Sequence, residues 1–302
     1  MLTGYLAAEG YESLVENQLV NIQDRIGRLF IVEGPIQRPY FAQNVWYDVE
    51  KVSFDSISQA AALLRAKGKL WAFYPFQFVR RGELISERLP YFAPKPLAFG
   101  SPSPKGVLGS WTMLDATSLY ASAKSSSPFA HGQVVFQESK IPPSRAYLKL
   151  WEALTLIGKS PTSSDVCLEV GASPGSWTWA LQQLGAQVIA VDKASLSELV
   201  MSLPRIEFIK KDAFALNPSD FRRIDWIFSD VICYPEKLLE WVHKWRQSCP
   251  WIHFVCTIKF QGDCSYEIVE EFLKIEGSTI FHLSNNKHEL TWVLLSSPSE
   301  SS

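Results

Sequence analysis

The sequence predicts an α/β protein in which a carboxy-terminal domain, built on a mostly parallel sheet, follows a smaller amino-terminal α+β domain. After Ser144, short apolar segments rich in Val, Ile, Phe and Trp alternate with helical segments, as in a parallel sheet covered by helices on both faces. Before residue 93 the strand-like and helical segments are shorter, and a proline-rich stretch separates the two patterns. We therefore predict domains at 1–92 and 144–302, joined by a Pro/Ser-rich connecting segment at 93–143.

The predicted amino-terminal domain is a small sheet with helices on one side, ferredoxin-like in layout. Its clearest helix covers residues 56–68, where Ser56 or Ser58 can cap the start and Gly68 can end it. Segments such as "RLFIVEG" and "KLWAFYPF" read as strands because β-branched and aromatic residues dominate them.

The carboxy-terminal pattern allows the sheet to be written out. Six segments read as strands: 165–171, 187–192, 206–213, 224–231, 251–260 and 288–295. Four segments between them have helical spacing: 176–185, 195–203, 235–248 and 265–277. The end of the chain, 278–295, reads as a strand, a polar turn and a second strand. An antiparallel hairpin that closes a mostly parallel sheet indicates the Rossmann-like class I SAM-dependent methyltransferase fold rather than the dehydrogenase variant.

Composition narrows the functional classes. With 302 residues, of which 47% are hydrophobic, the chain can bury a large core. The net charge of -2 gives no overall attraction to nucleic acid, so RNA binding would need local patches. No apolar run approaches the ~20 residues that span a bilayer, and no signal peptide is recognisable. We expect a cytoplasmic protein without membrane contact.

The five cysteines form no CxxC pair. An odd number without metal-ligand spacing favours reduced thiols over disulfides or a zinc site. We predict no structural metal.

The segment "DVCLEVGASPGSWTWAL" is the first candidate for ligand binding. An apolar strand ends at Glu169, and Gly171 and Gly175 open the backbone before a helix begins. The dehydrogenase motif G-x-G-x-x-G would need glycine at Ser173 and Ser176 as well, so a dinucleotide is disfavoured. S-adenosylmethionine carries no phosphate and needs a carboxylate for its ammonium group, which Glu169 or Asp230 could supply. A tight turn without a ligand remains the alternative.

Acidic residues at the ends of the next two strands favour the cofactor interpretation. Asp192 is placed to accept hydrogen bonds from ribose hydroxyls, and Asp212 from an adenine amino group. The predicted cofactor-binding residues are Glu169, Gly171, Ala172, Ser173, Pro174, Gly175, Ser176, Trp177, Asp192, Asp212 and Asp230.

Several segments together resemble a known family. "PPSRAYLKLWEAL", "LEVGASPGSWTWAL", "VIAVD", "DWIFSDV", "IKF" and "HELTWVLL" are similar, in this order, to the FtsJ-type ribose 2′-O-methyltransferases. Within that family they look most like bacterial enzymes that act on a cytidine of large-subunit ribosomal RNA. The resemblance covers 144 to about 296, and the amino-terminal part is similar in layout to a THUMP-like RNA-binding region. The chain departs from the family pattern at Glu169, at Ser176 and in "FQGDCS", which follows Lys259.

The resemblance implies a catalytic group made of Lys149, Asp230, Lys259 and Glu289. A ribose hydroxyl is a poor nucleophile and needs a base, and burial or a neighbouring ammonium favours the neutral form of a lysine. We expect Lys259 to be the base, with Lys149 beside it and the two carboxylates orienting the amines. Each residue taken singly could instead be a solvated surface charge.

For contact with RNA, Arg80 and Arg81 lie among aromatic residues in "FQFVRRGEL", a combination suited to phosphate contact and base stacking. A solvated helix start is the alternative. The sequence thus predicts an S-adenosylmethionine-dependent RNA ribose methyltransferase. A non-catalytic relative that binds RNA or the cofactor is the second hypothesis, and an NAD-dependent oxidoreductase is the third.

Overall fold

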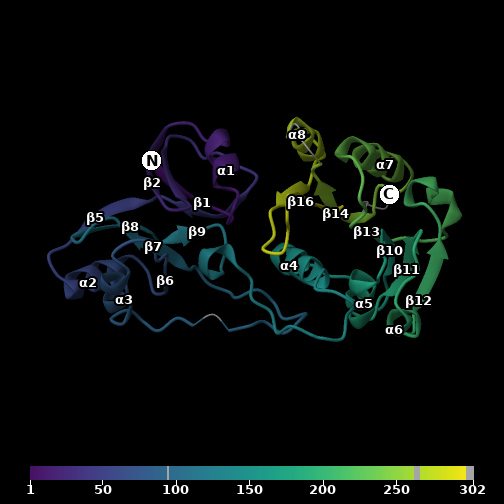
Figure 1. Ribbon diagram of the computed structural model, residues 1–302, viewed down its shortest axis with the longest axis horizontal. Coiled ribbons are helices and arrows are strands. Elements are labelled where there is room, and N and C mark those ends of the chain that lie inside the picture. Colours follow the sequence, from purple (N-terminus) through teal and green to yellow (C-terminus); the bar gives the residue numbers. More distant parts are fainter. Residues whose placement is uncertain (94, 262–265, 297–302) are drawn as a thin grey trace, which may run out of the picture. The chain divides into compact units, whose positions relative to one another are not determined.

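The computed structural model describes residues 1–93, 95–261 and 266–296 (Figure 1). The chain divides into two compact units. The amino-terminal unit contains Met1–Ala98 and Pro102–Gln137, and the carboxy-terminal unit contains Phe99–Ser101 and Glu138–Ser302.

A seven-stranded sheet forms the centre of the carboxy-terminal unit. Its strands are β10 (Val166–Val170), β11 (Gln187–Asp192), β12 (Ile206–Lys210), β13 (Trp226–Ser229), β14 (His253–Lys259), β15 (Ser278–Phe281) and β16 (Glu289–Leu294). The spatial order is β12-β11-β10-β13-β14-β16-β15, in which the first five strands are parallel and β16 pairs antiparallel with both β14 and β15. The predicted parallel sheet with a closing hairpin is confirmed.

Helices cover both faces of this sheet. They are α4 (Tyr147–Ile157), α5 (Ser176–Gln183), α6 (Glu198–Met201), α7 (Pro235–Ser248) and α8 (Glu267–Leu273), with short 3₁₀ turns η2 (Ala213–Ala215) and η3 (Pro218–Asp220). Figure 1 shows α4 and α5 on one side of the strands and α7 and α8 on the other. Because both faces are covered, β10 and β13 are mostly apolar and buried along almost their whole length. Functional side chains must therefore lie at the ends of the strands.

The amino-terminal unit contains two sheets. The first, in the order β2-β3-β1-β4-β9, contains β1 (Leu2–Ala7), β2 (Ile22–Ile26), β3 (Leu29–Glu33), β4 (Ala42–Tyr47) and β9 (Lys124–Ser125). The second, in the order β5-β8-β7-β6, contains β5 (Glu50–Ser53), β6 (Trp71–Phe73), β7 (Gly109–Met113) and β8 (Ser118–Ser122). The helical elements are α1 (Glu12–Gln18), α2 (Ile57–Lys67), α3 (Val79–Ser86) and the 3₁₀ turn η1 (Ala130–Gly132). As the sequence predicted, Ser56 caps α2, because its side chain accepts a hydrogen bond from the Gln59 amide.

This arrangement differs from the expected single, ferredoxin-like sheet and from the expected connecting segment at 93–143. Strands β7, β8 and β9 come from that segment and complete both sheets. All five residues of β7 and of β8 are buried, so neither strand has the charged, exposed face that marks a half-exposed strand in a sequence. The prolines before β7 and after β9 favoured the prediction of a connecting segment without strands.

Four of the five cysteines, Cys167, Cys233, Cys249 and Cys256, are free thiols. Cys264 lies outside the described residues, as does most of the "FQGDCS" segment. Among the helices that the structure describes, none combines the length and the apolar character needed to cross a bilayer.

Candidate active site

The loop between β10 and α5 depends on its two glycines for its own packing. Gly171 has φ +74°, and a Cβ there would lie 2.8 Å from the backbone of Val231, in the loop after β13. Gly175 has φ +108°, and a Cβ would lie 2.9 Å from Val200 Cγ1. An L side chain rarely adopts these φ values and has no space here. The glycines therefore hold the loop against its neighbours.

The amino end of α5 faces the residues that lead into helix α4. Ser176 and Trp177 are both buried. Ser176 Oγ accepts a hydrogen bond of 3.0 Å from the Ser144 amide, and Trp177 Nε1 donates one of 2.8 Å to the Ala146 carbonyl. These two predicted cofactor residues fix the amino end of α4, which carries Lys149.

Glu169 occupies a different position from the one expected of a carboxylate that faces the cofactor. Its side chain is buried beneath α5 and accepts a hydrogen bond from Thr178 Oγ1 at 2.5 Å. Burial raises the pKa of Glu169 to about 8, so the group is mainly neutral at pH 7. A neutral, enclosed carboxyl does not supply a negative charge for an ammonium group.

A cleft of about 480 Å³ opens at the carboxyl ends of the parallel strands. Of the predicted cofactor residues, Gly171, Asp192 and Asp212 line it. Asp192 is oriented by two backbone amides, since Oδ2 accepts from Ser173 N at 2.9 Å and Oδ1 from Ala194 N at 2.8 Å. Each carboxylate oxygen retains a lone pair for a further donor.

Asp212 is held by cationic and backbone donors together. Lys193 Nζ lies 2.8 Å from its Oδ2, and the Phe214 amide donates to its Oδ1 at 3.0 Å. The hydrogen bond from Lys193, followed by that from the Phe214 amide, holds the pKa of Asp212 below its usual value. The group is therefore ionised near neutral pH.

The remaining predicted loop residues do not line the cleft but are hydrogen-bonded to β11 and to the segment that follows it. The Ala172 amide donates to the Val191 carbonyl at 3.3 Å, and Ser173 Oγ donates to the Ser195 carbonyl at 3.0 Å. The Pro174 carbonyl accepts from the Ser197 amide at 3.0 Å.

Several lining residues were missed from the sequence. Phe214 lies on the wall of the cleft, with Lys237 Nζ 4.1 Å from its ring centroid. Ile232 and Tyr234, in the loop between β13 and α7, are largely exposed and also line it. Their positions in the sequence could have identified them, because they follow the carboxyl ends of β12 and β13, where ligands of such sheets bind.

The four residues of the implied catalytic group come together beside the cleft. Lys149 Nζ lies 2.9 Å from both carboxylate oxygens of Asp230 and 3.0 Å from Glu289 Oε1. Lys259 Nζ lies 3.1 Å from Asp230 Oδ1 and donates to the Asp230 carbonyl at 2.6 Å. Two cations and two carboxylates are thus gathered from α4, β14, β16 and the end of β13.

The surroundings of Lys149 keep its ammonium charged. Burial alone would lower the pKa of Lys149, but the charges of Asp230 and Glu289 outweigh it and raise the pKa above its usual value. A buried ammonium with two carboxylate partners is a stable, non-basic group.

Two long-range contacts hold the cluster in register. Lys259 and Glu289 are direct cross-strand partners in the antiparallel β14/β16 pair. Glu152, one turn after Lys149 on α4, accepts hydrogen bonds of 3.0 Å from the Ser284 amide and 2.9 Å from Ser284 Oγ, in the connection that leads to Glu289. Burial raises the pKa of Glu152 to about 7. Helix α4 and the residues before it are therefore bonded both to the amino end of α5 and to the connection that leads to Glu289.

The two arginines predicted to bind RNA have different surroundings. Arg80 is 74% exposed and pairs with Glu83 at 3.3 Å. The guanidinium of Arg81 lies 5.7 Å from the Phe54 ring centroid, against the apolar core of the amino-terminal unit. The structure therefore places only Arg80 where its charge is fully open to solvent.

Comparison with known proteins finds a family match within the carboxy-terminal unit. Residues 142–274 match the model of the FtsJ-like methyltransferase family. The chain is 32% identical over 135 residues to the ribosomal RNA large subunit methyltransferase M of Azoarcus sp. (strain BH72), covering 43% of this chain and 36% of the relative. It is 27% identical over 200 residues to the protein of the same name from Pasteurella multocida (strain Pm70), covering 59% of this chain and 54% of the relative. The chain thus spans between about one third and about half of the length of these relatives.

Among solved structures, a Burkholderia thailandensis 1,6-didemethyltoxoflavin-N1-methyltransferase with S-adenosylhomocysteine bound covers 51% of this chain and 78% of its own. The identity is 16% and the TM-score is 0.36, a likeness too distant to carry an argument about function.

Proposed function

We propose that this chain, whose residues 142–274 match the model of the FtsJ-like methyltransferase family, transfers a methyl group from S-adenosylmethionine to a ribose 2′-hydroxyl of RNA. The observation that supports this most is the joint placement of Lys149, Asp230, Lys259 and Glu289 beside a cleft at the carboxyl ends of the strands. These side chains lie far apart in the sequence, and chance would not bring two lysines and two carboxylates into one satisfied group.

The residues around the cleft fit S-adenosylmethionine. Asp192 has free lone pairs for ribose hydroxyls, and Phe214 offers an aromatic face beside Asp212, which can accept from an adenine amino group. Of the two carboxylates predicted for the ammonium group, Asp230 remains the candidate, because it precedes Val231 on the cleft wall, whereas Glu169 is buried beneath α5. When bound, the cofactor supplies an electrophilic methyl group.

The cluster divides the work between its lysines. The base must be neutral to accept a proton, and Lys149 is held as an ammonium by two carboxylates. Lys259 contacts one carboxylate oxygen and one backbone carbonyl, so we assign it as the base that accepts the proton of the 2′-hydroxyl. Asp230 orients both amines, and Glu289 orients Lys149. Alignment of the hydroxyl oxygen with the methyl group contributes much of the acceleration.

The similarity to methyltransferases of large-subunit ribosomal RNA suggests that RNA as the substrate. In this proposal the amino-terminal unit contributes to RNA binding, the protein acts in the cytoplasm, and no metal takes part.

The first experiment is a calorimetric titration of the purified chain with S-adenosylmethionine, with NADH as the control. Transfer of labelled methyl groups to total bacterial RNA follows, with digestion to nucleosides. Labelled 2′-O-methylnucleosides are the expected product. Binding of NADH alone would refute the cofactor assignment, and label on a base would refute the ribose assignment.

A further inference from the structure

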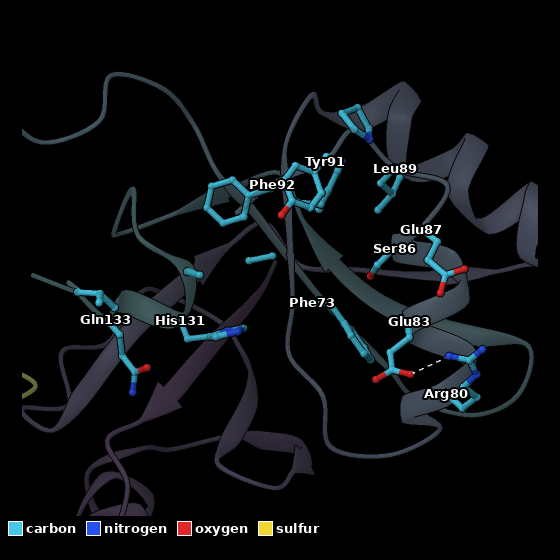
Figure 2. A pocket seen from close by; sticks show the side chains of 15 residues that line it. Phe73, Arg80, Glu83, Ser86, Glu87, Leu89, Tyr91, Phe92, His131 and Gln133 are labelled. Atoms are coloured by element: carbon cyan, nitrogen blue, oxygen red, sulfur yellow. Dashed lines mark hydrogen bonds and ion pairs between the residues drawn. The ribbon is translucent and has the colours of Figure 1, made fainter. Parts of the chain in front are cut away.

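A groove of about 750 Å³ lies entirely within the amino-terminal unit (Figure 2). Its walls come from β6, from α3 with the turn that follows it, and from the segment at η1. The groove belongs to neither the cleft nor the cluster of the other unit, and the proposed chemistry does not use it.

Aromatic side chains dominate one part of the groove. Tyr91 is 90% exposed, and Figure 2 shows it beside Phe92 at the rim. Phe73 forms the floor, where it stacks on Trp111 with ring centroids 4.5 Å apart. Gly82 lies directly against Phe73, since a Cβ there would be 2.1 Å from the ring. The floor is therefore fixed, while the Tyr91 ring is free to stack on a ligand.

Carboxylates outnumber cations in the same groove. Glu83 and Glu87 line it, together with Arg80, which pairs with Glu83. His131 adds no charge near neutral pH, because burial and the nearby charge of Arg28 lower the pKa of its imidazole. The groove therefore offers hydrogen-bond acceptors beside aromatic rings, and it does not attract a phosphate.

An adjoining hollow has cations at its edge. It is lined by Arg65, Gly68, Lys69, Leu70 and Pro90, and it shares Pro90 with the groove. Its surface is mainly apolar, while Arg65 and Lys69 are exposed, and this lining contains no carboxylate. Arg65 Nη1 donates to the Arg88 carbonyl at 2.6 Å, and the guanidinium keeps further donors. A hollow with cations at its edge thus lies directly beside an acidic, aromatic groove.

We infer that the groove and the hollow together bind an unpaired RNA nucleotide, with an amino-bearing base stacked on Tyr91 in the groove and its phosphate on Arg65 and Lys69. Aromatic side chains and cationic grooves are the usual means of holding single strands. Adenine, cytosine and guanine carry an exocyclic amino group that Glu83 or Glu87 can accept from, whereas uracil carries none. This inference rests on the proposed RNA substrate and adds a second contact to it.

Charge disfavours a peptide as the occupant. A basic peptide that suits Glu83 and Glu87 meets Arg65 and Lys69 next to them, and an acidic peptide meets the reverse. A nucleotide carries hydrogen-bond donors on its base and a negative charge on its phosphate. The base suits the acidic groove, and the phosphate suits the cations beside it.

The test measures binding of short, fluorescently labelled single strands of adenylate, cytidylate or uridylate to the full chain, without cofactor, by anisotropy at several salt concentrations. The adenylate and cytidylate strands should bind more tightly than the uridylate strand. Tyr91→Ala should weaken their binding about tenfold, whereas Tyr91→Phe, which keeps the ring, should not. Lys69→Glu should weaken all three strands and flatten the salt dependence. Ile36→Ala, at a position 52% exposed and outside the lining, is the matched control.

Equal affinity for the three strands, or unchanged affinity of Tyr91→Ala, would overturn the inference and leave the groove to a protein partner. The result is independent of catalysis, because binding is measured without cofactor and no methyl group is transferred. Normal methyl transfer with unchanged Tyr91→Ala binding would refute the groove alone. Absence of methyl transfer with the expected binding pattern would refute the proposed reaction alone.

Discussion

The proposed catalytic corner, formed by Lys149, Asp230, Lys259 and Glu289, and the interior beneath α5 surround their carboxyl groups with different partners. At the corner, Asp230 and Glu289 face the ammonium groups of Lys149 and Lys259 at 2.9–3.1 Å. Beneath α5, Glu169 has a hydroxyl as its hydrogen-bond partner, and its pKa rises to about 8. The carboxyl groups of the corner thus have cations as partners, whereas the one beneath α5 has none and its charged form is disfavoured by burial.

This difference separates function from packing. Both Glu169 and Asp230 belong to neighbouring parallel strands or their ends, and both looked suitable for the ammonium of the cofactor. Glu169 is mainly neutral at pH 7 and does not suit such a role, and only Asp230 has cationic partners. Substitutions at the corner should therefore affect turnover, whereas a substitution of Glu169 should affect stability and its dependence on pH.

The largest expected effect tests the corner. Lys259→Ala should lower methyl transfer by about 10²–10⁴-fold, the contribution of a general base, while cofactor affinity stays nearly unchanged. The measurements are single-turnover methyl transfer and calorimetry. Lys274→Ala, which removes an exposed lysine paired with Glu271, is the control. Normal turnover in Lys259→Ala would remove this residue from the mechanism.

The next effect tests the interior. In the unfolded chain Glu169 ionises near its ordinary pKa, but in the folded chain it keeps its proton up to about pH 8. The unfolded state therefore binds fewer protons in this window, and Glu169 should reduce stability as pH rises, on the order of 3 kcal/mol between about pH 5 and about pH 8. Glu169→Gln, which does not titrate, should lose less stability over the same window.

Urea denaturation at both pH values gives this comparison, and Glu207→Gln on the exposed face of β12 is the matched control. If the unmodified chain and Glu169→Gln showed parallel pH profiles, Glu169 would be charged in the folded protein, and the contrast with the corner would disappear.

The cofactor cleft lies between these extremes, because its carboxylates are oriented yet open to solvent. Asp192→Asn should weaken S-adenosylmethionine binding about tenfold, the value of one hydrogen bond to a charged group. Asp48→Asn, at an exposed position with φ +52° in the other unit, controls for the loss of a negative charge. An unchanged dissociation constant for Asp192→Asn would contradict the ribose contact.

The smallest effects apply the same contrast to two adjacent arginines. Arg80→Ala should weaken RNA binding about two- to threefold and flatten its salt dependence slightly. Arg81→Ala should leave RNA binding unchanged and lower the unfolding free energy by about 0.5–1 kcal/mol, because it removes a cation-π contact with Phe54. The reverse assignment of the two effects would mean that Arg81, not Arg80, meets the RNA.

The sequence predicted the carboxy-terminal sheet well, because its strands and helices differ in period and in length. It also predicted Asp192, Asp212 and the four residues of the corner at the ends of strands or in a family motif. It could not tell which way Glu169 points. Every residue of β10 is at least partly buried, so no alternation distinguishes one face from the other.

The sequence also did not predict the contacts between distant segments. The pairing of β9 with β4 joins residues about eighty positions apart, and the Glu152–Ser284 contact spans more than a hundred. Local propensity carries no information about such pairs. Phe214 and Tyr234 follow the ends of strands, as ligand-binding residues often do, but the folded cleft was needed to show that both line it together with Asp192.

The hydrogen bonds between Ser176 and Ser144 bear on how this chain could be engineered. Ser176 is one of the positions at which the sequence departs from the FtsJ-type pattern, and a substitution that restores the pattern would be a natural choice in engineering this loop. Here the serine hydroxyl anchors the residues that lead into α4, so the exchange would release the helix that carries Lys149. Ser176 therefore helps to position the helix that carries Lys149, a residue of the proposed catalytic group, and a transplanted loop would need Ser144 and α4 to come with it.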